Sequence, residues 1–172
     1  MYIIISVLFI SIIGTLLHFI YDVSNKNKII SLFAPVNEST WEHIKMGLSA
    51  TFIWSLYDGY LFGTHPNYFF AKTASIIVLI LMIPFIFYGY KIFTNKSILI
   101  LDIFIFYISI LLSQLTFTYI VNIKIYNEFL NYICVIILFV IFGFYMTLTI
   151  LPIKSELFKD PITKKYGIDK EC

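Results

Sequence analysis

Long runs of apolar residues, separated by short polar stretches, make up most of the chain as far as residue 151. These runs reach the roughly 17–25 residues that a helix needs to cross a bilayer core about 30 Å thick. They do not alternate between apolar and polar positions as membrane β-strands do, and a helix satisfies its backbone hydrogen bonds internally. The pattern predicts an all-α fold, a polytopic membrane bundle of five transmembrane helices, over residues 2–21, 44–62, 72–90, 97–121 and 129–151.

The second predicted span is the weakest of the five, because Lys45 lies at its start and Asp58 near its end. Without it the bundle would have four spans. We expect one membrane domain, residues 1–153, which includes a polar loop at residues 22–43. A polar cytoplasmic tail is expected at residues 154–172.

The composition supports a membrane protein and excludes an ordinary soluble domain. Hydrophobic residues make up 60% of the chain and charged residues only 13%, whereas soluble domains are about a quarter charged. The net charge of +2 is small, and the chain offers no soluble domain that could read bases. The lipid bilayer is therefore an expected partner and nucleic acid is not.

The orientation follows from the lysines, which are all twelve of the basic residues. Basic residues accumulate in cytoplasmic loops, so we expect the N-terminus outside and the C-terminus in the cytoplasm, which leaves only Lys72 and Lys124 outside. The N-terminus lacks a positive segment and a small-residue cleavage site, so the first span is expected to remain as an anchor. Cys134 and Cys172 are expected at different depths, without a disulfide between them.

Polar residues concentrate between Pro35 and His43, in the long loop between the first two spans. Ionisable groups at a membrane are costly and usually have a function. His18 and Asp22 are four residues apart and share one helix face, and Asp102 is expected at the same cytoplasmic depth in the fourth span. The predicted binding residues are His18, Tyr21, Asp22, Asn37, Glu38, Trp41, Glu42, His43, Asp58 and Asp102.

Two kinds of ligand suit this set of side chains. Imidazole and carboxylate groups bind Zn²⁺ and similar divalent metals, and His18, Glu38 and His43 are the predicted metal ligands. The same groups suit an organic solute, with Trp41 as a wall and the carboxylates facing a cationic group. No catalytic residue is identified, although Glu42 and His43 are candidates for a general base.

Two simpler interpretations remain open for parts of this set. Ser39 and Glu42 have the spacing of a capping box, in which Ser39 caps the second helix and Glu42 reaches back to the Ser39 N–H. On the other side of the membrane, Asp58 lies near His65 and Asn67. Asp58 is expected either to bond to neighbouring hydroxyl groups or to serve as an exit gate of a transport path.

The segment from Pro35 to Lys45, with the core P-V-N-E-S-x-W-E-H, resembles a family of small bacterial multi-pass membrane proteins of unknown function. His18 and Tyr21 precede this core, and the strings F-x-D-P and Y-G-I occur in the tail, so the resemblance covers most of the chain. It implies a bacterial cytoplasmic membrane location and a shared site region. It supplies no activity and no ligand.

Three functions remain open on the sequence. The leading one is binding or transport of a small solute or ion at the cytoplasmic mouth of the bundle. The second is a membrane-embedded enzyme, with or without a metal, acting on a lipid or lipid-linked substrate. The third is an accessory subunit, in which the loop at residues 22–43 docks a protein partner or another copy of the chain through Trp41.

Overall fold

The computed structural model describes residues 1–124 and 126–168. The predicted tail residues Lys170 and Cys172 lie outside this described part of the chain. Five long α-helices form there, with the short 3-10 helix η1 (Ile30–Leu32) between the first two. The long helices are α1 (Tyr2–Val23), α2 (Thr40–Phe62), α3 (Tyr68–Thr94), α4 (Leu99–Val121) and α5 (Glu128–Ile150). The predicted all-helical fold is confirmed for these residues.

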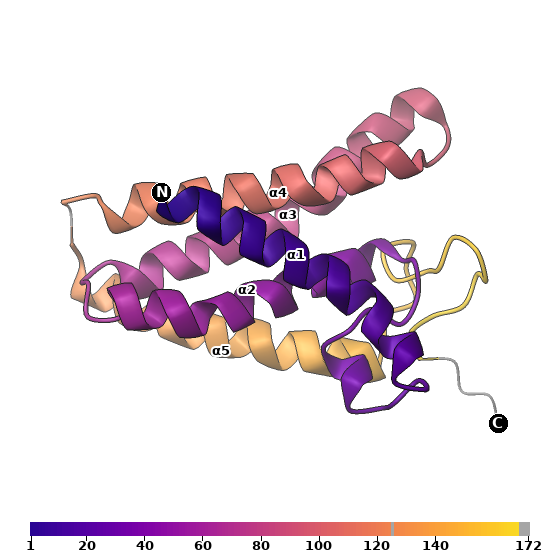
Figure 1. The fold of residues 1–172 in the computed structure, drawn as a ribbon, viewed down its shortest axis with the longest axis horizontal. Helices are drawn as coiled ribbons and strands as arrows, with labels where there is room; N and C mark the ends of the chain where they lie inside the picture. Colours follow the sequence, from indigo (N-terminus) through magenta and orange to yellow (C-terminus); the bar gives the residue numbers. More distant parts are fainter. Residues whose placement is uncertain (125, 169–172) are drawn as a thin grey trace.

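The helices lie along the long axis of the molecule, and successive helices run in opposite directions (Figure 1). The loop after α1, the turn after α3 and the tail after α5 gather at one end, which we call the loop end (Figure 1). The N-terminus and the connections after α2 and after α4 lie at the opposite end, which we call the far end. Helices α1, α3 and α5 therefore all run from the far end to the loop end.

In the described part of the chain, four helices are long and apolar enough to cross a membrane: α1, α3, α4 and α5. Helix α2 is not among them, although it has the same length as α4. It is instead the most enclosed helix, since thirteen of its residues are buried and only four are buried in α1. The fold thus surrounds its most polar long helix with apolar helices, whose outer faces are suited to lipid.

Close approaches among four helices, α1, α2, α3 and α4, fix the centre of the bundle. Gly14 of α1 faces the ring of Phe106 in α4, and a Cβ atom at Gly14 would lie 2.7 Å from that ring. Gly47 of α2 similarly leaves room for Leu79 of α3, which a Cβ atom would approach to 3.2 Å. The absence of a side chain at these two positions lets the helices approach closely. The contact with Gly14 sets the position of the Phe106 ring.

The tail after α5 folds back against the loop end. Phe158 is only 4% exposed and stacks on Trp41, with 4.9 Å between the ring centroids. The backbone N–H of Trp41 donates a 2.9 Å hydrogen bond to the carbonyl oxygen of Leu157. An isolated antiparallel bridge joins Lys159 to Tyr166 further along the tail. The tail is therefore anchored to the start of α2 by one buried aromatic pair and one backbone hydrogen bond.

Candidate functional site

Helix α2 begins within the polar stretch singled out in the sequence. Ser39 is its N-cap, and the Ser39 hydroxyl accepts a 3.4 Å hydrogen bond from the N–H of Glu42. The Asn37 side chain in turn accepts from the Ser39 N–H at 2.9 Å. The Glu42 carboxylate instead accepts from the Val36 N–H, also at 2.9 Å. The prediction for Ser39 is confirmed, but Glu42 does not close the capping box because Asn37 occupies its expected donor.

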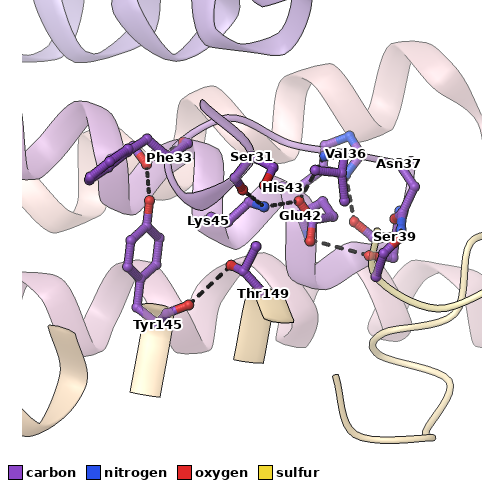
Figure 2. Close-up of polar contacts among 12 residues, drawn as sticks. Ser31, Phe33, Val36, Asn37, Ser39, Glu42, His43, Lys45, Tyr145 and Thr149 are labelled. Carbon is purple, nitrogen blue, oxygen red and sulfur yellow. Dashed lines mark hydrogen bonds and ion pairs between the residues drawn. The ribbon is translucent and has the colours of Figure 1, made fainter. Parts of the chain in front are cut away.

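Glu42 forms a buried ion pair with Lys45, one turn further along α2. The Lys45 ammonium lies 2.5 Å from the Glu42 carboxylate, and the two side chains are 0% and 2% exposed. Lys45 also donates a 2.9 Å hydrogen bond to the carbonyl oxygen of Ser31 in η1 (Figure 2). The pair thus supplies a donor and an acceptor to the polypeptide backbone of the loop that covers it.

Further polar contacts hold the same loop and the tail. The Ser49 hydroxyl, on α2, donates to the carbonyl oxygen of Phe33 at 2.5 Å and also bonds to the hydroxyl of Tyr145 on α5. The Asn37 amide donates a 3.3 Å hydrogen bond to the carbonyl oxygen of Gly167 in the tail. Much of the stretch from Pro35 to Lys45 therefore holds the protein's own loop and tail in place.

Three other members of the predicted set converge on an open surface. The Nε2 atom of His18 lies 3.5 Å from one oxygen of Glu38, and Nε2 of His43 lies 3.9 Å from the other. The two imidazole rings come from α1 and α2, with 6.3 Å between their centroids. The other ring nitrogen of His43, Nδ1, lies 3.0 Å from the carbonyl oxygen of Ser39. This contact fixes the ring so that Nε2 points towards Glu38.

These three side chains line a cavity of about 600 Å³ at the loop end. The cavity lies between α1, the loop, α2, α3, α4 and the tail, and apart from Lys91 and Asp102 its walls on α3 and α4 are apolar. The complete lining consists of His18, Glu38, Thr40, His43, Ile83, Phe87, Lys91, Ser97, Leu99, Asp102, Ile105, Phe106, Pro161 and Ile162. Such a mixture of apolar walls and a few polar groups is typical of sites for small organic molecules.

Asp102 and Lys91 complete the charged groups of the cavity. The Tyr90 hydroxyl donates a hydrogen bond to Asp102 and accepts one from the Ile98 N–H at 3.1 Å, which joins the end of α3 to the start of α4. The Lys91 ammonium lies 5.4 Å from the centroid of the Phe87 ring. The Asp102 carboxylate is therefore fixed in place, and Lys91 lies over an aromatic wall.

A second, smaller depression of about 270 Å³ adjoins the tail. Tyr21, Asp22 and Asn37 line it together with Glu38. Glu38 therefore lies on the wall between this depression and the larger cavity.

The structure divides the predicted binding residues into distinct groups. His18, Glu38, His43 and Asp102 share the large cavity, as their common predicted depth implied. Tyr21, Asp22 and Asn37 lie beside it. Glu42 is enclosed by the loop, and the Trp41 side chain, expected as a ligand wall, is 8% exposed and stacks on Phe158. The aromatic walls Phe87 and Phe106 were missed because they look like ordinary residues of an apolar span.

The described residues contain no group of three His, Cys, Asp or Glu side chains that could hold a metal ion. His18, Glu38 and His43 adjoin one another, but at 3.5 and 3.9 Å their contacts are those of loosely paired groups. The predicted metal site therefore stays a prediction.

A separate polar centre lies near the far end. Asp58 of α2 is 0% exposed and pairs with Lys72 of α3, with 2.5 Å between the charged atoms. Tyr68 donates to the same carboxylate at 2.8 Å, and Tyr2 donates at 3.4 Å. The sequence predicts Lys72 on the outer side of the membrane and hydroxyl groups as the neighbours of Asp58. Lys72 is instead buried, and its spacing of fourteen residues from Asp58 gave no local signal of the pair.

The two residues grouped with Asp58 in the sequence lie elsewhere. Asn67 is buried and its amide donates a 2.7 Å hydrogen bond to the carbonyl oxygen of Ile123 after α4. His65 is exposed and accepts from the Asn67 N–H at 3.3 Å. Their contacts are with the connections of the far end.

The fold and the site together define a class: a helical bundle with four apolar helices suited to a bilayer, a buried polar helix and one amphiphilic cavity at the loop end. The chain belongs to a family of unknown function, DUF6512, whose family model matches residues 1–168. The predicted membership of an uncharacterised family is thus confirmed. The comparisons found no match among curated proteins and none among solved structures.

Proposed function

We propose that this protein binds a small solute in the cavity at the loop end, as the binding step of a transport or solute-handling role. The single observation that carries this proposal is the convergence of His18, Glu38, His43 and Asp102, from four segments of the chain, on one cavity of about 600 Å³. Charged groups at a membrane are costly to bring together. A purely structural role would be expected to pair His18, Glu38 and His43 closely, as Glu42 is paired.

The proposal includes a fifth span, formed by α2. Helices α1 and α3 both run from the far end to the loop end (Figure 1), so the chain must return to the far end between them. If α1 and α3 both cross the bilayer, α2 has to cross it as well. Its polar side chains are compatible with this position because they are paired inside the bundle and thirteen of its residues are buried.

The proposed orientation has the loop end in the cytoplasm. Lys45 and Lys72 are buried and carry no topological information. Of the remaining lysines in the described part of the chain, only Lys124 lies at the far end. The others belong to the loop, the last turn of α3, the connection after α3 and the tail, on the side where basic residues accumulate.

Transport in particular is supported by the contrast between the two ends. The cavity is open at the loop end, whereas the buried Asp58–Lys72 pair and its two tyrosines fill the bundle near the far end. This is the arrangement expected of a carrier that is open to the cytoplasm and closed to the outside. Release on the other side would require the far-end contacts to separate.

The binding function is tested with purified protein in lipid nanodiscs. The shift in unfolding temperature is measured with a panel of small organic cations, organic anions, neutral amphiphiles and Zn²⁺. We expect at least one class to stabilise the wild type and to lose this effect in His43→Ala and Glu38→Gln. Glu128→Gln, which alters an exposed carboxylate that accepts a hydrogen bond from Tyr132 and lies outside the cavity lining, is the matched control. If no class stabilises the wild type, or if both cavity variants respond like the control, the binding function is wrong.

A membrane-embedded enzyme is the second candidate, and the fixed ring of His43 is the observation that favours it. A general base is commonly oriented by a hydrogen bond to its other ring nitrogen, and Ser39 supplies such a partner to Nδ1 of His43. Incubation with a native lipid extract, followed by mass spectrometry, tests this function. Lipid turnover by the wild type that is absent in His43→Ala would replace the carrier proposal with the enzyme. A docking role would need an anchor other than Trp41, which stacks on Phe158.

A further inference from the structure

We infer that the ligand of this cavity carries a primary ammonium group on an apolar body, with the ammonium bound between Glu38 and His43. This inference rests on the proposed binding function and names the chemical class of its ligand. It comes from the hydrogen-bonding requirements of the side chains at the cavity, from the nature of the opposite wall and from the balance of charge.

His43 presents an acceptor to the cavity. The carbonyl oxygen of Ser39 can only accept, so Nδ1 of His43, 3.0 Å away, donates to it. In the neutral ring the remaining nitrogen, Nε2, is then an acceptor. It faces an oxygen of Glu38 at 3.9 Å, which is too long for a direct hydrogen bond. Two acceptors therefore face each other across a gap that a donor group would bridge.

Glu38 requires the same kind of partner. Neither oxygen of its carboxylate accepts a hydrogen bond of normal length from the described residues, since its neighbours His18 and His43 lie at 3.5 and 3.9 Å. The side chain is 43% exposed at the meeting point of the cavity and the smaller depression. A primary ammonium has three donors and a positive charge, so one such group can satisfy Glu38 and His43 together.

The opposite wall specifies an apolar body. It is formed by α3 and α4, where Ile83, Phe87, Leu99, Ile105 and Phe106 line the cavity. An ion alone would leave most of the 600 Å³ cavity without favourable contacts, whereas a hydrocarbon or aromatic group would remove this wall from water. The ring of Phe87 already has one cation near it, the Lys91 ammonium at 5.4 Å.

The charge balance favours a cation over an anion. The lining contains two carboxylates, Glu38 and Asp102, and one ammonium, Lys91. Tyr90 donates to one oxygen of Asp102, and the other oxygen accepts no hydrogen bond from a described residue. A cationic ligand therefore enters a cavity with more negative than positive charge, whereas an anion would meet two like charges.

The ammonium could belong to a soluble amphiphilic amine or to the ethanolamine headgroup of a lipid. The probe is 3-phenylpropylamine, measured by calorimetric titration of the wild type in nanodiscs of phosphatidylcholine, which has no primary amine. The matched neutral probe is 3-phenylpropan-1-ol, which has the same apolar body. A second set of nanodiscs contains phosphatidylethanolamine, which competes with the probe if the lipid headgroup occupies the site.

We expect the amine to bind the wild type at least tenfold more tightly than the alcohol. Glu38→Gln should weaken amine binding tenfold or more, while Glu128→Gln leaves it unchanged. Because Glu38 has no close hydrogen bond within the described residues, Glu38→Gln should keep the wild-type unfolding temperature. Competition by phosphatidylethanolamine in the wild type identifies a lipid ligand, and its absence identifies a soluble amine.

Equal binding of the amine and the alcohol, or full amine binding by a folded Glu38→Gln variant, would overturn the inference. The outcome of the solute panel separates this failure from that of the proposed function. If an anion or a neutral amphiphile binds and is lost in His43→Ala while the amine does not bind, the cavity is a binding site for another class. If nothing in the panel binds, the binding function itself fails.

Discussion

Two buried ion pairs account for much of the polar architecture at the scale of single residues. Glu42 and Lys45 hold the loop at one end of α2, and Asp58 and Lys72 join α2 to α3 near the other end. Removing one partner of such a pair leaves a charge without compensation in a medium of low dielectric constant. Replacing both partners is far less harmful, so the two kinds of change can be compared directly.

Lys45→Met should lower the free energy of unfolding by about 3–5 kcal/mol, because Glu42 would keep a buried charge without its partner. Denaturant unfolding in detergent micelles measures the change. The double variant Glu42→Gln with Lys45→Met should recover most of the loss, since a glutamine oxygen can still accept from the Val36 N–H. Lys159→Met is the control, because its partner Glu156 is exposed in the tail. A single variant as stable as the wild type would show that the pair does not hold the loop.

Asp58→Asn should likewise destabilise the protein by about 3–5 kcal/mol, because the Lys72 ammonium would remain buried beside a neutral amide. The same unfolding measurement applies, with Asp58→Asn combined with Lys72→Met as the recovering variant. Reduced flux in the single variant would therefore not by itself indicate an exit gate. Loss of flux in a stable double variant would, whereas normal flux there would assign the pair a structural role only.

At the scale of the helices, the position of each element depends on close contacts between small and large side chains. Gly14 of α1 receives the Phe106 ring of α4, and this ring is a wall of the cavity. The contact therefore couples helix approach to the shape of the site. A change in α1 that touches no ligand should alter binding through this ring.

Gly14→Ala should destabilise the bundle by about 1–3 kcal/mol, since the new Cβ atom would lie 2.7 Å from the Phe106 ring and overpack the core. It should also weaken any solute binding found for the wild type. Gly89→Ala is the matched control, because a Cβ atom there would have no neighbour within 4 Å. Thermal unfolding and probe titration of both variants check the prediction. Equal behaviour of the two variants would contradict it.

The hydrophobic pattern predicted a helix for each of the five runs, but it set two starts too late. Helix α2 begins at Thr40, four residues before the predicted span, and α3 begins at Tyr68, also four residues early. The additional first turn of α2 contains the charged residue Glu42, whereas the predicted span of α3 began at the charged residue Lys72 itself. Each is buried with a partner, and the sequence gives no sign of such a pair before the helices are placed side by side.

The depth of the site residues was predictable, while their directions were not. His18, Glu38, His43 and Asp102 share a cavity, as their positions at the ends of the spans implied. Glu42 and His43 are adjacent, so their side chains point about 100° apart on the helix. One is enclosed by the loop and the other faces the cavity. Which direction meets the cavity depends on how α2 is rotated among its neighbours, and a single sequence does not specify that rotation.

At the scale of the whole molecule, the number of spans determines on which side of the membrane the connections between the helices lie. If α2 crosses the bilayer, the loop after α1 and the connection after α2 lie on opposite sides of the membrane. If it does not cross, both lie on the same side, and α1 and α3 cannot both span in the direction seen in Figure 1. Exposed positions exist in both connections, at Lys28 and Thr64.

We expect Thr64→Cys, in a background without Cys134 and Cys172, to react with a membrane-impermeant maleimide in intact spheroplasts. Lys28→Cys and the control Lys96→Cys, in the turn after α3, should react only after permeabilisation, because basic loops are retained in the cytoplasm. Labelling of Lys28→Cys and Thr64→Cys from the same side would exclude α2 as a span. The reverse pattern would keep five spans but invert the orientation, and the cavity with Glu38 and His43 would then face the outside, where its ligand would have to be captured.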